Sequence, residues 1–142
     1  MIDKVGLLTI RDGRVLLCRK KRGTQLLILP GGKREAGESS FECLARELRE
    51  ELGEVEAVEP ELVGVYQHQA AGEPEKRVRI ELYRAALTGT PHAQSEIGEL
   101  VWFGAGDDWR TLAPSLAEAI FPDLIARGLL PHRFTPRTVQ FP

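Results

Sequence analysis

Hydrophobic and polar residues follow two different periods along this chain. Between Arg77 and Leu87, apolar and charged side chains alternate, which predicts a strand with one buried face. After Ser39 the apolar positions recur at helical spacing instead, and they are Phe41, Leu44, Ala45, Leu48 and Leu52. The sequence therefore predicts a helix from Ser40 to Leu52 and an α+β fold.

Shorter apolar runs predict five further strands, which are Lys4 to Ile10, Val15 to Arg19, Leu26 to Leu29, Leu62 to His68 and Leu100 to Phe103. The Asp12-Gly13 pair between the first two suits a tight hairpin turn with positive φ angles. Residues Pro30 to Gly32 are predicted to stop regular pairing and to leave backbone groups free to face a ligand. Residues Gln69 to Lys76 are predicted to be a loop.

Capping residues mark where the helices begin and end. Ser39, followed three positions later by Glu42, has the pattern of a capping box, and Gly53 is a natural stop. A second amphipathic helix is predicted from Pro114 to Ala126, with Gly128 closing it.

The chain length fits one domain. With 142 residues, the chain is predicted to be a single domain over 1–142, of which 129–142 form a tail with three prolines. Prolines favour an extended arm, which we expect to pack on the domain or on a second subunit. Both a monomer and a homodimer are compatible with the sequence.

Charge and cysteine content narrow the function classes. The formal net charge of −2 argues against binding to a nucleic-acid polymer, because such binding needs a marked basic excess. Arg11 and Asp12 interrupt the apolar run at the start, so neither a signal peptide nor a membrane span is predicted. Cys18 and Cys43 have no Cys or His at ligand spacing beside them, so we interpret them as free thiols of a cytoplasmic protein.

The segment from Gly32 to Glu54 is the richest in candidate chemistry. At about 100° per residue, Glu47, Glu50 and Glu51 fall within an arc of roughly 100° on one face of the predicted helix. Like charges crowded in this way repel one another, and a hard cation such as Mg²⁺ would relieve the repulsion. Because protein-bound Mg²⁺ usually also binds substrate phosphates, this set of carboxylates indicates phosphate chemistry. A solvated helix with ordinary ion pairs explains the same spacing, so this pattern alone leaves both interpretations open.

The same segment resembles the Nudix box, G-x5-E-x7-R-E-U-x-E-E-x-G-U, in which U is a bulky apolar residue. Eight positions match at the fixed spacing, and they are Gly32, Glu38, Arg46, Glu47, Leu48, Glu50, Glu51 and Gly53. The last position departs from the pattern, because Glu54 stands where an apolar residue is expected. The first strands, the LPGGK segment and the late SEIGELVWF segment extend the resemblance over residues 1 to about 125.

The resemblance implies a Nudix-type α/β/α sandwich, in which the two predicted helices cover a mixed β-sheet. It also implies a Mg²⁺-dependent hydrolase in which Mn²⁺ can substitute. In this family, the glutamates that match Glu47, Glu50 and Glu51 bind the metal, and the backbone carbonyl that matches Gly31 or Gly32 often adds a ligand.

The resemblance assigns roles around the metal as well. Glu38 looks like the partner of Arg46, and this pair is expected to orient the loop against the helix. The general base is either Glu47 or an acidic residue from a distant loop, for which Glu96 and Glu99 are the candidates. We also predict Glu96 as a metal ligand and Glu99 as a substrate contact.

Two features of the sequence help to predict the substrate: its basic side chains, and the absence of residues that mark particular Nudix subfamilies. Lys33 and Arg34, in the loop that should face the metal, and Arg19, which begins a basic run, are predicted to contact phosphates. The residues beyond the box read Gln69, Ala70, Ala71 and lack the proline or tyrosine of ADP-ribose and dinucleoside polyphosphate hydrolases.

Elimination therefore leaves a nucleoside triphosphate, modified ones included, as the expected substrate, with the nucleoside monophosphate and pyrophosphate as products. A nucleoside diphosphate sugar or ADP-ribose pyrophosphatase is the alternative. A non-catalytic nucleotide-binding Nudix domain is the alternative of another class, and the presence of all four box carboxylates argues against it.

Overall fold

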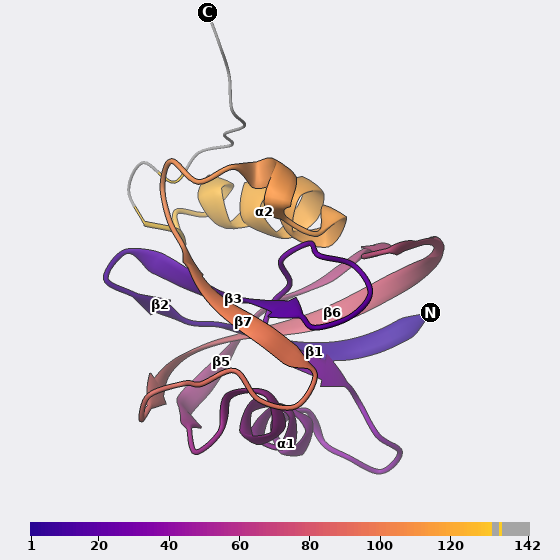
Figure 1. Cartoon of the computed structure of the whole chain (residues 1–142), viewed down its shortest axis with the longest axis vertical. Helices are drawn as coiled ribbons and strands as arrows, with labels where there is room; N and C mark the ends of the chain where they lie inside the picture. Colours follow the sequence, from indigo (N-terminus) through magenta and orange to yellow (C-terminus); the bar gives the residue numbers. More distant parts are fainter. Residues whose placement is uncertain (132–133, 135–142) are drawn as a thin grey trace, which may run out of the picture.

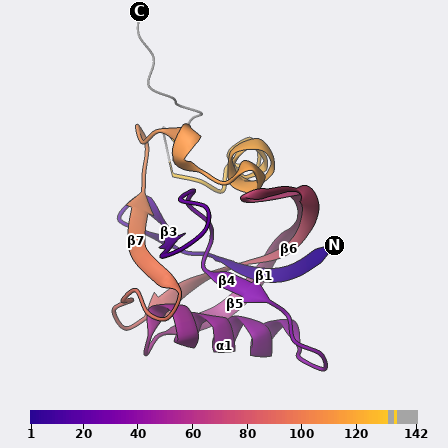
Figure 2. The ribbon, with the colours of Figure 1, turned by 45° about the vertical axis from the view of Figure 1, so that its right-hand side comes forward.

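Two helical segments lie on opposite sides of the β-strands (Figure 1). The computed structural model describes residues 1–131 and 134. Helix α1 (Ser40–Leu52) covers one side of the strands and α2 (Phe121–Ala126) covers the other, as the turned view in Figure 2 also shows. This arrangement confirms the predicted α+β sandwich with one helix on each side.

The larger sheet is mixed, as predicted. Its strands lie in the order β4 (Gly31–Lys33), β1 (Ile2–Leu8), β6 (Glu73–Thr88) and β5 (Glu56–Ala70). β1 and β6 run parallel, with Ile2 opposite Val78 and Leu8 opposite Arg84, whereas the other two pairs are antiparallel. The first strand of the chain therefore lies inside the sheet.

A second sheet is antiparallel and holds β2 (Ile10–Arg11), β3 (Arg14–Lys20) and β7 (Ile97–Phe103). The strand predicted from Lys4 to Ile10 is divided between the two sheets at Thr9, whose carbonyl accepts a hydrogen bond from Leu16. The strands therefore form two separate sheets, whereas one mixed sheet was expected. Asp12 and Gly13 have φ angles of 52° and 74°, which confirms the predicted hairpin turn.

The segment before β4 is not the strand predicted from Leu26 to Leu29. It makes only single bridges, through Leu27 and Ile28. Leu27 is 2% exposed, and its backbone N–H donates to the carbonyl of Thr111 in a neighbouring loop. Burial therefore accounts for the apolar run, although the segment joins no continuous ladder.

Gly31 and Gly32 pair with β1, so the prediction that they stop regular pairing is wrong. Gly31 lies opposite Gly6 and has a φ angle of 133°. A Cβ atom on Gly31 would lie 2.1 Å from the carbonyl oxygen of Val5. The missing side chain is therefore what allows the two backbones to approach closely.

β5 and β6 form one long hairpin, so the predicted loop from Gln69 to Lys76 is also wrong. β5 continues to Ala70, β6 starts at Glu73, and two residues make the turn between them. The first five residues of β6 are all exposed. Strand residues with both faces in solvent need no alternation of apolar and polar side chains, so the sequence gives no strand signal there.

Helix α1 has the ends that the sequence predicted. The Ser39 hydroxyl accepts a hydrogen bond from the N–H of Glu42 at 3.1 Å, and the Glu42 carboxylate accepts one from the N–H of Ser39 at 2.8 Å. Gly53 ends the helix with a φ angle of 88°. The buried side chains of this helix are Cys43, Leu44, Leu48 and Leu52, and they pack on the larger sheet.

Residues 114–126 are helical, as predicted, but a π-helical turn at Leu116–Ile120 precedes α2. The N–H of Phe121 donates to the carbonyl of Leu116, five residues earlier. Pro122 has no N–H, and its ring would clash with a carbonyl four residues earlier in a regular α-helix. The wider turn gives this proline room within the helical segment.

The predicted tail, residues 129–142, lies mostly outside the described residues. Phe134 is described and is 3% exposed. Its ring centroid lies 6.0 Å from that of Phe103 and 5.2 Å from that of Phe121. This part of the predicted tail packs on the core.

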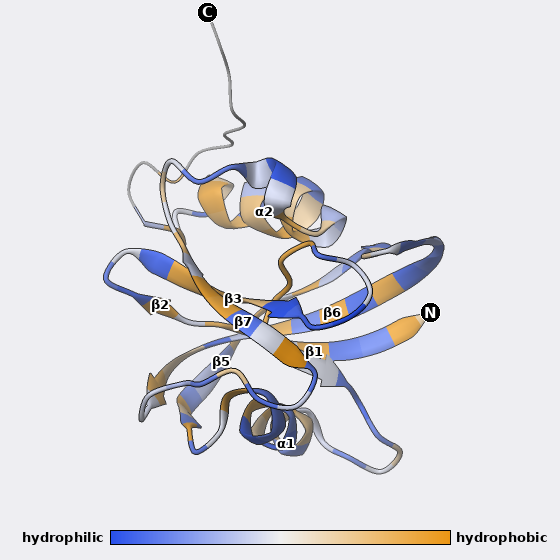
Figure 3. Ribbon diagram, viewed as in Figure 1, coloured by the Kyte–Doolittle hydropathy of each residue, from blue (hydrophilic) through white to orange (hydrophobic). Residues whose placement is uncertain are grey.

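Hydrophobic residues follow the strands and α2 in Figure 3, whereas much of the visible face of α1 is hydrophilic. The buried side chains form two clusters, one beneath each helical layer. In the part of the chain described here, every helix is too short or too polar to cross a membrane.

Candidate active site

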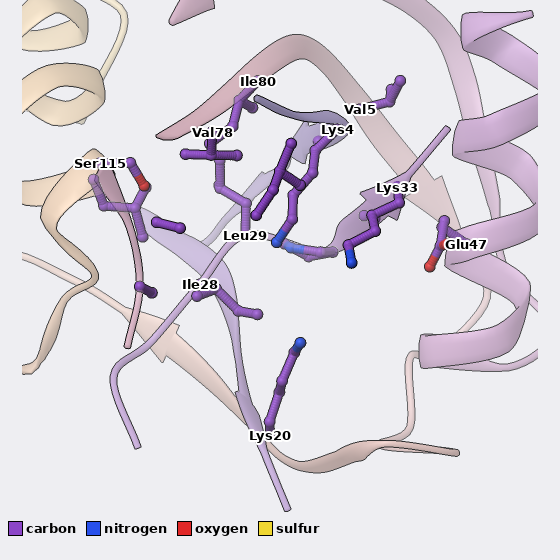
Figure 4. A pocket seen from close by; sticks show the side chains of 18 of the residues that line it. Lys4, Val5, Lys20, Ile28, Leu29, Lys33, Glu47, Val78, Ile80 and Ser115 are labelled. Atoms are coloured by element: carbon purple, nitrogen blue, oxygen red, sulfur yellow. The ribbon is translucent and has the colours of Figure 1, made fainter. Parts of the chain in front are cut away.

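A cavity of about 370 Å³ lies against the larger sheet, and its lining includes residues of α1 and of the second helical segment. Charged side chains line the part of the cavity next to α1, and they include Lys4, Lys20, Lys33, Glu47, Glu51 and Glu96. The rest of the lining is mostly aliphatic and includes Ile2, Ile28, Leu29, Val78, Ile80 and Leu116, together with the polar side chains of Thr24, Glu73 and Ser115. The cavity therefore has a charged end and an apolar end (Figure 4).

Glu51 reaches the cavity from the last turn of α1. Its Oε1 accepts a 2.9 Å hydrogen bond from the backbone N–H of Gly31. Burial raises the pKa of the Glu51 carboxyl to about 7, against the effect of that hydrogen bond, and the nearby Glu47 carboxylate raises it further. Because the ionised form of this partly buried carboxyl is disfavoured, a nearby positive charge would stabilise it.

Glu47 lies one turn earlier and against the backbone of β4. A Cβ atom on Gly32 would lie 2.4 Å from the Cδ of Glu47, so a side chain at this position would displace the carboxylate. Burial raises the pKa of Glu47, and a 2.9 Å hydrogen bond from Nη1 of Arg46 acts in the opposite direction. Figure 4 shows the carboxylate of Glu47 facing the cavity.

Glu50 does not share this position, although it belongs to the same turn of α1. Its side chain is 54% exposed and lies 3.5 Å from Nη1 of Arg46, outside the cavity lining. Across residues 1–131 and 134, no three His, Cys, Asp or Glu side chains are gathered as a metal-binding group. The structure thus brings together two of the three predicted metal carboxylates.

Arg46 connects α1 to the loop before it. Nε of Arg46 lies 2.6 Å from Oε2 of Glu38, and its Nη2 lies 2.9 Å from Oε1 of the same carboxylate. Nη2 also donates to the carbonyl of Lys33 at 3.0 Å. The hydrogen bonds from Arg46 hold the pKa of Glu38 at about 2. The pair expected from the sequence is present, and it ties β4, the loop and α1 together.

Three lysine side chains enter the cavity from three strands, and Figure 4 shows their ammonium groups directed toward a common space. Lys33, on β4, is a predicted substrate contact, and Lys20, on β3, belongs to the basic run after Arg19. Lys4, on β1, was missed by sequence reasoning. No local pattern marks it, because its place in the cavity depends on the pairing of β1 with β4 and β6.

Other predicted contacts lie outside the cavity lining. Arg34 pairs with Glu81 at 3.1 Å, and Arg19 pairs with Glu99 across β3 and β7. Of the two acidic residues predicted from the late loop, Glu96 lines the cavity and Glu99 does not. The geometry therefore favours Glu96 over Glu99 as an acidic partner of the helix carboxylates.

The donor set at the charged end fits a hard divalent cation. Glu47 and Glu51 supply carboxylate oxygens, and both are partly buried beside the backbone of Gly31 and Gly32. Oxygen ligands of this kind suit Mg²⁺, which is usually held by a few carboxylates together with water and phosphate. Burial is the main cause of the raised pKa of both carboxyls, and a bound cation would stabilise their ionised forms.

A glycine-bounded loop, a glutamate-rich helix and a mixed sheet between two helical layers are the parts of a Nudix domain, and the comparisons agree. The family model of the NUDIX domain matches residues 2–121. The chain therefore belongs to the Nudix family, and it is a Nudix hydrolase.

Two curated relatives are similar in sequence. CTP pyrophosphohydrolase of Escherichia coli (strain K12) is 40% identical over 75 residues, which span 51% of this chain and 55% of that protein. An uncharacterised Nudix hydrolase of Bacillus subtilis (strain 168) is 30% identical over 132 residues, which span 87% of this chain and 80% of that protein. The first match thus covers about half of each protein, and the second covers most of both.

Solved structures are similar over most of the chain. The solution structure of the E. coli ORF135 protein has a TM-score of 0.70 and 32% identity, and the match covers 89% of this chain and 92% of that one. A MutT Nudix hydrolase from Burkholderia pseudomallei has a TM-score of 0.65 and 29% identity, with 75% and 84% covered. These likenesses agree with the Nudix fold described above.

Proposed function

We propose that this Nudix hydrolase cleaves a nucleoside triphosphate into the nucleoside monophosphate and pyrophosphate, with Mg²⁺ as its cofactor. The observation that carries the proposal is the cavity, in which the carboxylates of Glu47 and Glu51, three lysines and an apolar end adjoin one another. Carboxylates suit the metal ion, lysines suit phosphates, and the aliphatic end suits a nucleoside. The similarity to a CTP pyrophosphohydrolase supports a triphosphate substrate.

The metal ligands proposed for this site are Glu47, Glu51, Glu96 and the carbonyl of Gly31 or Gly32, which line the cavity, and Glu50, which lies outside its lining. A bound Mg²⁺, or Mn²⁺ in its place, polarises phosphoryl oxygens and lowers the pKa of an attacking water. Glu50 points toward Arg46 in the structure, so it is the ligand whose side chain has to turn most.

The other residues act by binding, orienting and proton transfer. Arg46 and Glu38 hold the loop against α1, and the N–H of Gly31 orients the carboxylate of Glu51. Glu47 or Glu96 accepts the proton of the attacking water, because both line the same part of the cavity. Attack on an internal phosphorus then releases pyrophosphate rather than orthophosphate.

We also propose that the protein is cytoplasmic, because of the state of its two cysteines. Cys18 and Cys43 are both free and buried, and neither is paired in a disulfide. Burial raises the pKa of the Cys43 thiol to about 11, so this side chain is a poor thiolate nucleophile. Two inert free thiols fit a protein of the reducing cytoplasm.

The function is tested with a substrate panel and phosphorus NMR. Nucleoside triphosphates, ADP-ribose and a nucleoside diphosphate sugar are incubated with the protein and Mg²⁺, and the first products are identified. We expect a nucleoside monophosphate and pyrophosphate from a triphosphate, and no turnover in excess EDTA. Orthophosphate as the first product, or full activity in EDTA, would contradict the proposal.

A panel without any turnover would favour a non-catalytic nucleotide-binding domain instead. Preferred cleavage of ADP-ribose or of the sugar nucleotide would assign the protein a different substrate class, and the proposed metal site would be unaffected.

A further inference from the structure

Lys4 lies in the middle of a row of side chains that crosses the larger sheet. It is in register with Lys33 on β4 and with Ile80 on β6. Residues in register project from the same face of a sheet, so these three side chains line one wall of the cavity, as Figure 4 shows. The row leads from the charged end, beside Glu47, to the apolar end.

The ammonium group of Lys4 has no partner of its own in the described part of the chain. No hydrogen bond and no ion pair within 4.0 Å joins it to another described residue. By contrast, Arg34, Arg46 and Arg79 on the same sheet and helix are all paired with carboxylates. The positive charge of Lys4 therefore remains available to a ligand.

Burial makes this lone charge unfavourable. Desolvation lowers the pKa of Lys4, the positive charge of Lys20 lowers it further, and the carboxylate of Glu51 acts against both. Lys4 is partly buried, and a partly desolvated ammonium group without a hydrogen-bonded anion costs free energy, which an anion in the cavity would recover.

The neighbouring carboxylates do not fill this role. Glu73, which also lines the cavity, pairs with Lys76 at 2.9 Å. Glu51 accepts a hydrogen bond from Gly31, and Glu47 accepts one from Arg46. Both are also the carboxylates that suit the metal ion, which would take up their charge. The anion that fits beside Lys4 is therefore a phosphate group of the substrate.

We propose that Lys4 binds the phosphate next to the nucleoside, at the boundary between the two ends of the cavity. The inference rests on the proposed function, because it assumes a nucleotide with its nucleoside at the apolar end. A chain of phosphates that starts beside Ile80 meets Lys4 first and Lys33 afterwards. Lys4 thus helps to select the phosphorus that faces the carboxylates, and Lys33 binds the pyrophosphate that leaves.

The test compares binding of the two products. Lys4→Met keeps the length of the side chain and removes its charge, and Lys21→Met makes the same change at an exposed lysine outside the cavity lining. Dissociation constants for AMP, GMP, CMP, UMP and pyrophosphate are measured separately by calorimetry with Mg²⁺. Lys33→Met is measured in the same way.

We expect Lys4→Met to weaken the best-bound monophosphate by roughly 10-fold or more, since a hydrogen bond to a charged group is lost. Pyrophosphate affinity should change by less than about twofold, because that contact is not made. Lys33→Met should show the opposite pattern, and Lys21→Met should resemble the wild type. Lys4→Arg, which keeps the charge, should restore much of the monophosphate affinity.

Equal losses for both products in Lys4→Met would reduce Lys4 to a structural residue, and a loss for pyrophosphate alone would place it at the leaving group. A wild-type protein that binds none of the monophosphates would also overturn the inference. Lys4→Met could weaken monophosphate binding alone in a protein that does not hydrolyse triphosphates. The proposed function would then be wrong, whereas the phosphate site at Lys4 would be supported. Thermal melting confirms folding, and Lys4→Gln replaces a Met variant that does not fold.

Discussion

The backbone N–H of Gly31 donates a 2.9 Å hydrogen bond to the carboxylate of Glu51, and this bond joins the first residue of β4 to the last turn of α1. The bond holds a buried carboxyl group at the charged end of the cavity. Burial outweighs the hydrogen bond and raises the pKa of Glu51 to about 7. The site is therefore arranged around a carboxylate that ionises reluctantly.

The raised pKa makes the stability of the metal-free protein depend on pH. The ordinary pKa of this group is 4.5, so the folded protein holds the proton more tightly than the unfolded chain does. The resulting stabilisation is full below pH 4.5 and is lost as the pH rises through about 7. In EDTA, the free energy of unfolding of the wild type should fall over this range relative to Glu51→Gln, as urea titrations at several pH values would show.

Glu50→Gln is the control for that measurement, because it removes the same charge from a side chain that is 54% exposed. An identical pH dependence in the wild type and in Glu51→Gln would contradict the prediction.

Loss of a metal carboxylate should reduce turnover strongly. We expect Glu51→Gln and Glu50→Gln each to lower kcat by roughly 100-fold or more at saturating Mg²⁺, since each removes one of the metal ligands proposed above. Glu54→Gln makes the same charge change at an exposed position after the helix, and it should leave kcat unchanged. Near wild-type turnover in Glu50→Gln would show that this side chain stays with Arg46 during the reaction.

The contacts of Arg46 predict a loss of activity without a loss of the helix. Arg46→Ala removes the bidentate pair with Glu38 and the bond to the carbonyl of Lys33. Turnover should fall roughly 10- to 100-fold, because the partners of metal-binding groups set their orientation. Helical circular dichroism and the Mg²⁺ dependence of turnover are measured together, and a variant with normal values of kcat and of Mg²⁺ dependence would leave Arg46 as a surface charge.

The close contact between Gly32 and Glu47 predicts a specific effect on the metal site. A Cβ atom there would lie 2.4 Å from the Cδ of Glu47, so Gly32→Ala has to displace that carboxylate. The displaced atoms are the mobile end of a side chain, so the free energy of unfolding should change little, and the variant should need more Mg²⁺ for half-maximal turnover. In Gly64→Ala the added atom would meet Tyr66 at 3.4 Å, an ordinary contact, so this variant serves as the control. Equal Mg²⁺ requirements in the two variants would argue against close packing of Glu47 on Gly32.

Features that depend on neighbours in sequence were predicted well. The capping box at Ser39, the stop at Gly53 and the spacing of Arg46 and Glu38 all appear in the structure as expected. Each of these features involves residues of one helix or of the loop beside it. There the helical repeat determines which side chains lie next to each other. The box carboxylates follow the same rule, except that Glu50 turns toward Arg46.

Features that depend on distant pairing were not predictable. Lys4 lines the cavity because β1 lies between β4 and β6, and nothing within residues 2–8 indicates these neighbours. The exposed start of β6 lacks alternation for a similar reason, since its pairing with β5 rather than its burial makes it a strand. The glycines of β4 were read as a break, whereas their small size is what permits the pairing with Val5 and Gly6.

The parallel pairing of β1 with β6 also sets an order of folding. The β2–β3 hairpin and α1 are closed by contacts between residues near in sequence, but Ile2 meets Val78 only after the intervening chain has looped back. Closing a long loop costs conformational entropy before its contacts are made, so such pairings form slowly. On a ribosome, α1 can therefore form with its carboxylates before residues 78–84 have been synthesised. The wall that carries Lys4 is completed only afterwards, which makes the catalytic surface one of the last parts of the molecule to assemble.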